Sequence, residues 1–131
     1  MTRHSLITYL IVFAGAGLGG SLRHAVNRLA STIPGSVPWP TLIVNVSGCL
    51  AMGLLAGWFA FRGESAQGIR LFLATGLLGG YTTFSAFSLD VALLWERDAM
   101  WSAAGYVLAS VVGAIAAMFV GLLAARAWTG P

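Results

Sequence analysis

The chain has 131 residues, of which 58% are hydrophobic and 8% are charged. A typical soluble domain is about 25% charged, so this composition excludes an ordinary soluble fold and indicates a protein whose surface faces a lipid bilayer. The net charge of +3 comes from scattered arginines and no lysine, which argues against a nucleic-acid-binding surface.

Four long stretches without a charged residue divide the chain. A helix needs about 20 mainly apolar residues to cross a bilayer, and each stretch is long enough. The first span continues to Leu22, past the length of a typical signal-peptide core. We therefore predict an all-α membrane protein with a single transmembrane domain over residues 1–131. Its four transmembrane helices are expected at about 5–28, 39–61, 68–96 and 100–126.

The loops between these predicted helices contain residues that end helices. The prolines in 33–40 have no backbone N–H to donate, so this stretch cannot continue a helix. Pro40 is expected in the first turn of helix two, where no such donor is needed. The second loop is predicted over 62–68, and the third, over 96–98, is short enough to force antiparallel neighbours. Tryptophans, which favour membrane interfaces, fall near the span ends: Trp39, Trp58, Trp95, Trp101 and Trp128.

Arginines show almost no preference for one side of the membrane. On the side of both termini lie Arg3, Arg62, Arg70 and Arg126, and on the other side lie Arg23, Arg28 and Arg97. A weak positive-inside bias permits insertion in both orientations and an antiparallel dimer. The alternative is an orientation bias in details that this count of arginines misses.

The small residues within the spans indicate close helix packing. In lipid, helices associate by van der Waals contact, and glycines let backbones approach. The spacings do not name the partners: Gly15-xxx-Gly19, Gly53-xxx-Gly57, Gly76-xxx-Gly80 and Gly113-xxx-Ala117-xxx-Gly121. The single cysteine, Cys49, is interpreted as a small buried hydrophobe.

The sequence contains no HExxH motif, phosphate-binding loop or paired carboxylates within a span, so an enzyme is not indicated. Neutral polar residues at membrane depth remain, and each needs a reason because unpaired polar groups are costly there. Asn45 is the most informative of them. It is either an interhelical clamp or an N–H donor aimed at an anion, with Thr41 one turn earlier on the same face.

Helix three combines a double glycine with hydroxyl-bearing residues. Gly79 and Gly80 precede two β-branched threonines, Thr82 and Thr83, which together form poor helical sequence. The alternatives are a break in helix three, which would free carbonyls for a hard cation, or a continuous helix with packing glycines. Phe84 and Phe87 follow at i and i+3. They are either packing residues or ring edges directed at a small anion.

These residues resemble a known family. The segment Gly79–Ser88, GGYTTFSAFS, is similar to the GG-x-TTFSTFS signature of the Fluc (CrcB) fluoride channels. The resemblance extends to Thr41–Gly48 in helix two and to Gly17-xx-Gly20-xx-Arg23 in helix one, and length, span count and poor charge bias agree. It implies a dual-topology, antiparallel homodimer in the cell (inner) membrane that exports cytoplasmic fluoride passively and so relieves fluoride toxicity.

The resemblance also implies roles for individual residues. Along the fluoride path it places Phe84, Phe87, Asn45, Ser85, Ser88, Thr41, Tyr106 and Ser110, with Arg23 in the vestibule. Backbone carbonyls of Gly79 and Thr82 from both subunits would hold one structural Na⁺ at the dimer centre. This chain departs from the pattern at Ala86, where the family has threonine, and at Asp90, where a relative has glutamate.

Two alternatives belong to other functional classes. A small proton-coupled four-helix exporter would need a membrane-embedded carboxylate in helix one, and the sequence has none between Arg3 and Arg23. A non-transporting membrane assembly subunit would explain the glycines and Asn45 as packing, but it leaves the polar segment of helix three and the two phenylalanines without a purpose.

Overall fold

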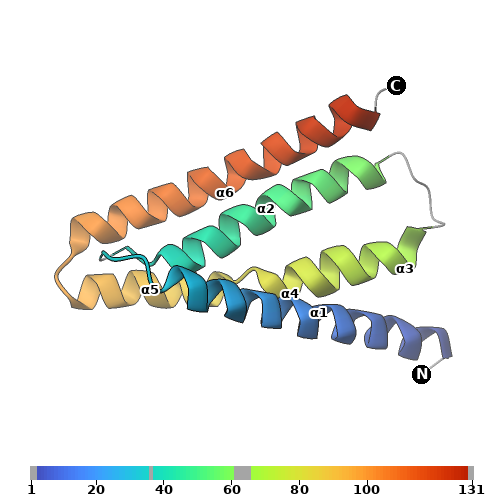
Figure 1. The fold of residues 1–131 in the computed structure, drawn as a ribbon, viewed down its shortest axis with the longest axis horizontal. Helices are drawn as coiled ribbons and strands as arrows, with labels where there is room; N and C mark the ends of the chain where they lie inside the picture. The colour runs from blue at the N-terminus through green and yellow to red at the C-terminus, as the bar shows by residue number, and fades with distance from the viewer. Residues whose placement is uncertain (1–2, 36, 61–65, 130–131) are drawn as a thin grey trace.

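The computed structural model describes residues 3–35, 37–60 and 66–129, and every regular element in these ranges is helical (Figure 1). The predicted all-α class is therefore confirmed. The elements in chain order are α1 (Arg3–Ala30), α2 (Trp39–Phe59), α3 (Gln67–Arg70), the π-helix η2 (Leu71–Leu78), α4 (Gly79–Tyr81), α5 (Phe84–Glu96) and α6 (Met100–Thr129).

The described helices make up four candidate spans that are long and apolar enough to cross a membrane, as predicted. The third span combines α3, η2, α4 and α5. They are Ser5–Ala30, Trp39–Phe59, Gln67–Glu96 and Met100–Trp128. Pro40 lies in the first turn of α2, where its missing N–H has no helical partner to lose. Gln67 and Gly68, expected in the second loop, instead begin α3, while 62–65 of that loop lie outside the described residues.

The helices form two packed pairs. α6 lies along α2, and α1 lies along η2 and α4, with both pairs visible side by side in Figure 1. The start of α1 and the end of α6 lie at the same end of the molecule as the end of α2 and helix α3. The α5–α6 connection lies at the opposite end, as short antiparallel connections require.

Glycines set the closeness of both pairs. A Cβ on Gly76 would lie 2.9 Å from the Gly15 Cα, and a Cβ on Gly80 would lie 2.8 Å from the Ala16 Cα. On the other pair, a Cβ on Gly121 would lie 2.9 Å from the Leu54 nitrogen. These distances are too short for a side chain, so the glycine spacings of α1 and of η2–α4 face each other across one interface.

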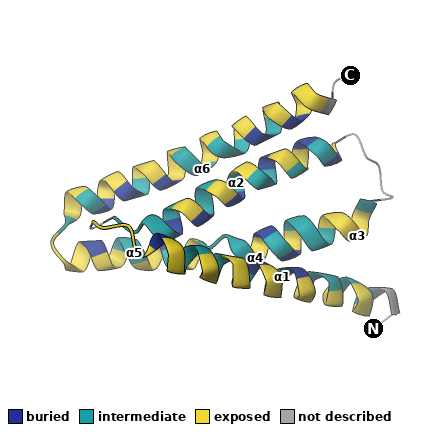
Figure 2. Ribbon diagram, viewed as in Figure 1, coloured by how far each residue is buried: buried dark blue, intermediate teal, exposed yellow. Residues whose placement is uncertain are grey.

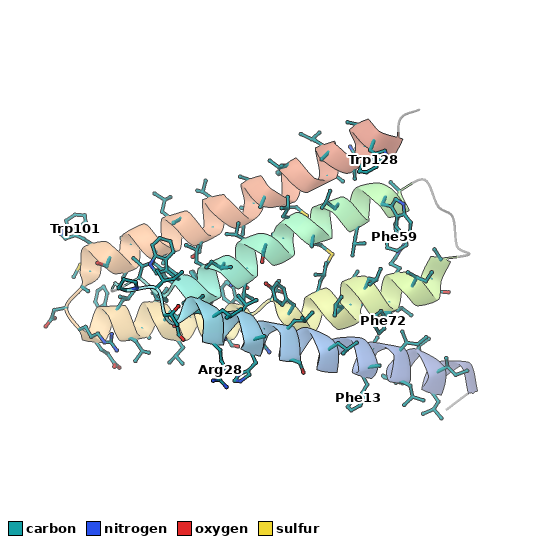
Figure 3. All side chains as sticks on the ribbon, in the orientation of Figure 1. Phe13, Arg28, Phe59, Phe72, Trp101 and Trp128 are labelled. Atoms are coloured by element: carbon teal, nitrogen blue, oxygen red, sulfur yellow. The ribbon has the colours of Figure 1, made fainter. Side chains whose placement is uncertain are left out.

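Apolar side chains cover the outside of the molecule along its length. Phe13 is 78% exposed and Leu108 is 66% exposed, and Figure 2 shows exposed residues on the outer faces of α1 and α6. In water this surface would drive aggregation, whereas lipid tails solvate it. Trp101 and Trp128, which lie at opposite ends of α6 in Figure 3, match the two interfaces of a bilayer.

Candidate functional site

The third span departs from helical geometry at two threonines. Thr82 has φ −77° and ψ 157°, and Thr83 has φ −153° and ψ 118°, so both are extended between α4 and α5. The double glycine that precedes them is helical. Gly80 is needed instead for its close approach to α1, and the extended residues are the β-branched ones.

Asn45 of α2 holds this extended segment. Its Nδ2 donates to the Thr83 carbonyl at 2.9 Å, and its Oδ1 accepts from the Thr83 N–H at 2.8 Å. The carboxamide thus replaces both backbone partners that Thr83 would have in a continuous helix. The observed bonds are those of the interhelical clamp, and they use one of the two N–H groups of Nδ2.

Two backbone carbonyls at this segment lose their helical hydrogen-bond donors. In an α-helix the carbonyl of residue i accepts from the N–H of residue i+4. The donor for Gly79 would be the Thr83 N–H, which instead bonds to Asn45. The donor for Thr82 would be the Ala86 N–H, which instead bonds to the Thr83 Oγ1 at 3.2 Å. Both carbonyls therefore lack the donor that a regular helix would supply.

Thr83 is also the N-cap residue of α5. Its Oγ1 accepts from the Ala86 N–H, which is the N-cap arrangement, and lies 3.1 Å from the Ser85 Oγ. Thr83 was not among the site residues predicted from the sequence. A hydroxyl residue three positions before a helical N–H was the signal that could have identified it as a cap.

A cavity of about 280 Å³ lies beside the extended segment, between it and helices α2 and α6. It brings together four residues predicted from sequence for the fluoride path: Asn45, Phe84, Phe87 and Ser110. The other lining residues are Cys49, Thr82, Thr83, Val111, Ala114 and Ile115. Cys49 is half-buried in this wall, and no site role was predicted for it from the sequence.

The two phenylalanines lie on one face of α5 but in different surroundings. Their ring centroids are 5.4 Å apart with the planes tilted by 48°. Phe87 is buried at 9% exposure, against the ring of Tyr106 at 5.5 Å, whereas Phe84 is 78% exposed. Phe87 is therefore a buried part of the cavity wall, whereas Phe84 lines the cavity at its edge and exposes most of its ring on the surface of the chain.

A second set of polar side chains, formed by Asp90, Tyr106 and Ser110, lies between α5 and α6. The Tyr106 hydroxyl, buried with its ring at 3% exposure, donates to the Asp90 carboxylate at 3.1 Å. Ser110, one turn further along α6, is 6% exposed, and its Oγ has no hydrogen-bond partner in the described structure. The Ser110 hydroxyl lines the cavity and lies near the Tyr106 hydroxyl. An unpaired buried hydroxyl costs free energy.

The remaining predicted residues lie outside this cavity. Thr41 is buried in the first turn of α2. Ser88 donates to the Phe84 carbonyl at 3.0 Å, and Ser85 is exposed beside Thr83. Arg23 is half-buried in α1, two turns before the helix ends. No group of three His, Cys, Asp or Glu side chains comes together within the described ranges.

Comparison with known families places the chain. The family described as CrcB-like protein, Camphor Resistance (CrcB), matches residues 10–122. This chain belongs to the CrcB family. The match begins in α1 and ends in α6, so it includes the Asn45 clamp, the extended threonines and the cavity.

Curated relatives share most of the chain. A fluoride-specific ion channel FluC of Rhodopseudomonas palustris (strain BisB5) is 58% identical over 94% of this chain and 100% of its own length. A fluoride-specific ion channel FluC of Methylobacterium nodulans is 55% identical over 92% of this chain and 98% of its own. A fluoride-specific ion channel FluC 2 of Nitrobacter hamburgensis is 54% identical with the same coverage.

Proposed function

We propose that this CrcB-family chain is one subunit of a fluoride-selective ion channel that lets cytoplasmic fluoride leave the cell passively. The observation that carries the proposal is the cavity in which Asn45, Phe84, Phe87 and Ser110 meet at the clamped segment of the third span. Relatives that are 54–58% identical over nearly their whole length are named fluoride-specific ion channels. A channel moves ions without making or breaking covalent bonds, so the protein is not an enzyme.

The cavity offers neutral groups that suit a small dehydrated anion. The second N–H of the Asn45 amide and the unpaired Ser110 hydroxyl are donors, and the phenylalanine ring edges carry partial positive charge. Its described lining contains no arginine, so no full charge holds the ion in place. An ion that binds weakly at several such groups is able to leave as well as enter.

Structural Na⁺ is part of the same proposal. The carbonyls of Gly79 and Thr82, which lack their helical donors because Asn45 and the Thr83 hydroxyl take them, fit a hard monovalent cation. Such carbonyls at interrupted membrane helices are oxygen ligands for Na⁺. When bound, the ion would supply fixed positive charge at the crossing of two third spans.

We further propose that the channel is an antiparallel homodimer in the inner membrane. Phe84 is a large apolar ring that is 78% exposed beside the cavity, and a second copy would complete the wall that one chain leaves open. The nearly balanced arginine count on the two sides gives neither orientation a strong preference.

Fluoride efflux from liposomes tests the channel. Purified protein is expected to release F⁻ and to retain Cl⁻, with a rate that does not require a pH gradient. Background efflux from a protein shown to be folded and dimeric would contradict the channel. Efflux that depends on a pH gradient would instead support the proton-coupled exporter, and no transport of any ion would support the assembly subunit.

Labelling of one engineered cysteine tests the dual orientation. In a Cys49→Ala background, Glu96→Cys places a thiol at the end of α5, at the end of the molecule opposite both termini, and leaves every arginine in place. A membrane-impermeant maleimide added outside intact cells is expected to label about half of the copies. Labelling of nearly all or none would show a single orientation and contradict the antiparallel dimer.

A further inference from the structure

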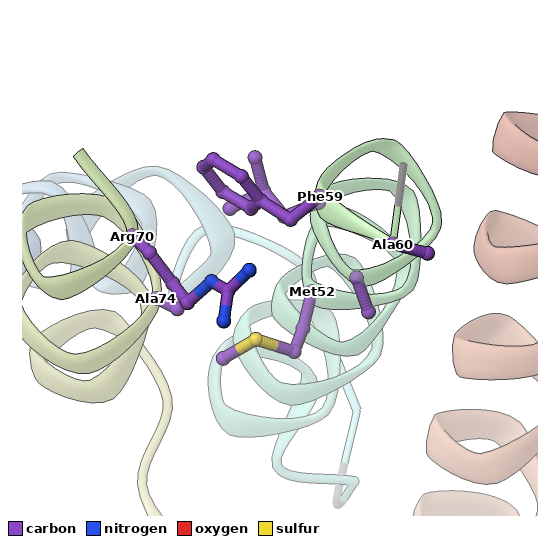
Figure 4. Close-up of a pocket in the computed structure, with 7 residues that line it drawn as sticks. Met52, Phe59, Ala60, Arg70 and Ala74 are labelled. Atoms are coloured by element: carbon purple, nitrogen blue, oxygen red, sulfur yellow. The ribbon is translucent and has the colours of Figure 1, made fainter. Parts of the chain in front are cut away.

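A second cavity lies far from the clamped segment, at the end of the molecule that carries both termini. It has a volume of about 370 Å³, within the range of small-molecule sites. Its walls come from the last two turns of α2 and from the start of the third span. Figure 4 shows the Arg70 guanidinium extending from α3 across the space toward α2. The lining includes Met52, Ala56, Phe59, Arg70 and Ala74.

The mouth of this cavity lies at the end of the second candidate membrane span. Phe59 is the last residue of α2, and Figure 3 places it at the same end as Trp128. Met52 lies seven residues earlier in α2, which is about 10 Å deeper along the helix axis. The cavity thus extends from the end of α2 toward the middle of the span, and its inner walls are apolar side chains. In a bilayer this orientation would place its mouth near the headgroups and its inner end in the hydrocarbon.

Arg70 supplies one charge at the mouth. Its guanidinium carbon lies 5.3 Å from the centre of the Phe59 ring, a cation–π contact that favours this position beside α2. The acidic residues that the structure describes, Asp90, Glu96 and Asp98, all follow the extended segment, at or toward the other end of the molecule. Within the described residues, the guanidinium therefore keeps its donors for an external anion.

We propose that this cavity binds an anionic phospholipid. The phosphate would accept hydrogen bonds from Arg70, a geometry that a guanidinium forms bidentately. One acyl chain would fill the apolar space between α2 and η2 down to Met52. Charge complementarity at the mouth and an apolar interior below it are the two ends of one lipid molecule. The proposal is independent of which ion the protein conducts.

Lipid binding to the purified full-length protein tests the site. Native mass spectrometry in neutral detergent, with phosphatidylglycerol and phosphatidylcholine of identical acyl chains, reports apparent affinity for each lipid. The wild type is expected to prefer phosphatidylglycerol. Arg70→Gln should weaken that binding about fivefold to tenfold, the effect of one arginine at an anionic surface. Arg97→Gln, which removes an exposed arginine at the opposite end, should leave it unchanged.

Two further variants complete the test: Ala56→Leu asks whether the lipid occupies the cavity itself, and Glu64→Gln asks whether the acidic residue nearest to Arg70 in the sequence affects binding. Ala56→Leu narrows the cavity while keeping the charge, and it should weaken phosphatidylglycerol binding in a protein that remains dimeric. Glu64→Gln, in the loop outside the described residues, should not weaken binding.

Four results would overturn the proposal. The first is equal affinity of the wild type for the two lipids, and the second is an equal effect of Arg70→Gln and Arg97→Gln. The third is full competition by millimolar inorganic phosphate, which would show a free-anion site instead. The fourth is an Ala56→Leu variant that loses dimerisation but keeps lipid affinity, which would show that a second copy of the chain covers the cavity.

Discussion

The clamp between Asn45 and Thr83 gives the sharpest quantitative test of this structure. Asn45→Leu keeps the branched shape and the number of side-chain heavy atoms but removes both the acceptor for the Thr83 N–H and the donor to its carbonyl. Hydrogen bonds between membrane helices contribute about 0.6 kcal/mol on average and about 1.7 kcal/mol at most. Loss of two such bonds should therefore destabilise the extended segment by about 1.2–3.4 kcal/mol.

Amide hydrogen exchange measures this loss where it occurs. A factor of ten in an equilibrium corresponds to about 1.4 kcal/mol, so local opening should become roughly 8-fold to 300-fold more frequent. Peptides that contain Thr83 and the first turn of α5 should exchange faster by that factor in Asn45→Leu. Peptides from the end of α6 should be unaffected, because they do not depend on this clamp.

Matched variants identify which atom matters. Asn45→Asp keeps an acceptor for the Thr83 N–H but places a second oxygen opposite the Thr83 carbonyl. This variant should lose about half of the hydrogen-exchange protection at Thr83 and most of the fluoride flux. Ser47→Ala removes a hydroxyl two residues away that bonds to the Ile43 carbonyl and lies 3.0 Å from the Tyr81 hydroxyl. It should leave exchange at Thr83 unchanged. If Asn45→Leu exchanges at the wild-type rate, the clamp does not hold the segment and our reasoning is wrong.

Three other substitutions have expected outcomes. Gly15→Val should prevent α1 from packing on η2 and abolish the monodisperse peak in gel filtration, while Gly17→Val, whose Cβ has no atom within 4 Å, should elute normally; equal behaviour would contradict the close-packing role. Phe87→Ala should lower the free energy of unfolding by about 3–5 kcal/mol, as for other buried aromatics. Phe84→Ile should instead reduce fluoride efflux while the protein stays stable and dimeric, and unchanged efflux would remove Phe84 from the path. Tyr106→Phe leaves the Asp90 carboxylate without the Tyr106 hydroxyl as its donor and should slow fluoride efflux. Efflux at the wild-type rate would show that this hydroxyl is dispensable.

The helices themselves could be predicted from the sequence because lipid imposes a simple rule. Backbone groups in hydrocarbon must bond internally, so an uncharged stretch of sufficient length forms a spanning helix. The four observed spans begin and end within three residues of the predicted ranges. The second loop was predicted too long at its end, since Gln67 and Gly68 start α3, and nothing in their polarity distinguishes a loop from a first turn.

The glycine spacings predicted close contact but not the partner. Gly15 and Gly76 are separated by most of two spans in the chain, and only the packed structure brings their backbones together. The same holds for Gly121 of α6, which meets the backbone of α2 near Leu54. A spacing of four residues marks one face of one helix, and many pairings of four such faces satisfy it.

Composition and pattern determined that this chain spans a membrane four times, that its third span contains a segment of unusual polarity, and that Asn45 needs a partner. The tertiary structure decided which partner that is. Asn45 could be read from sequence as a clamp or as an anion donor, and the bonds to Thr83 show the clamp while leaving one N–H unused. The reason is physical: a polar group in hydrocarbon must be satisfied, but the group that satisfies it is fixed by how the helices cross.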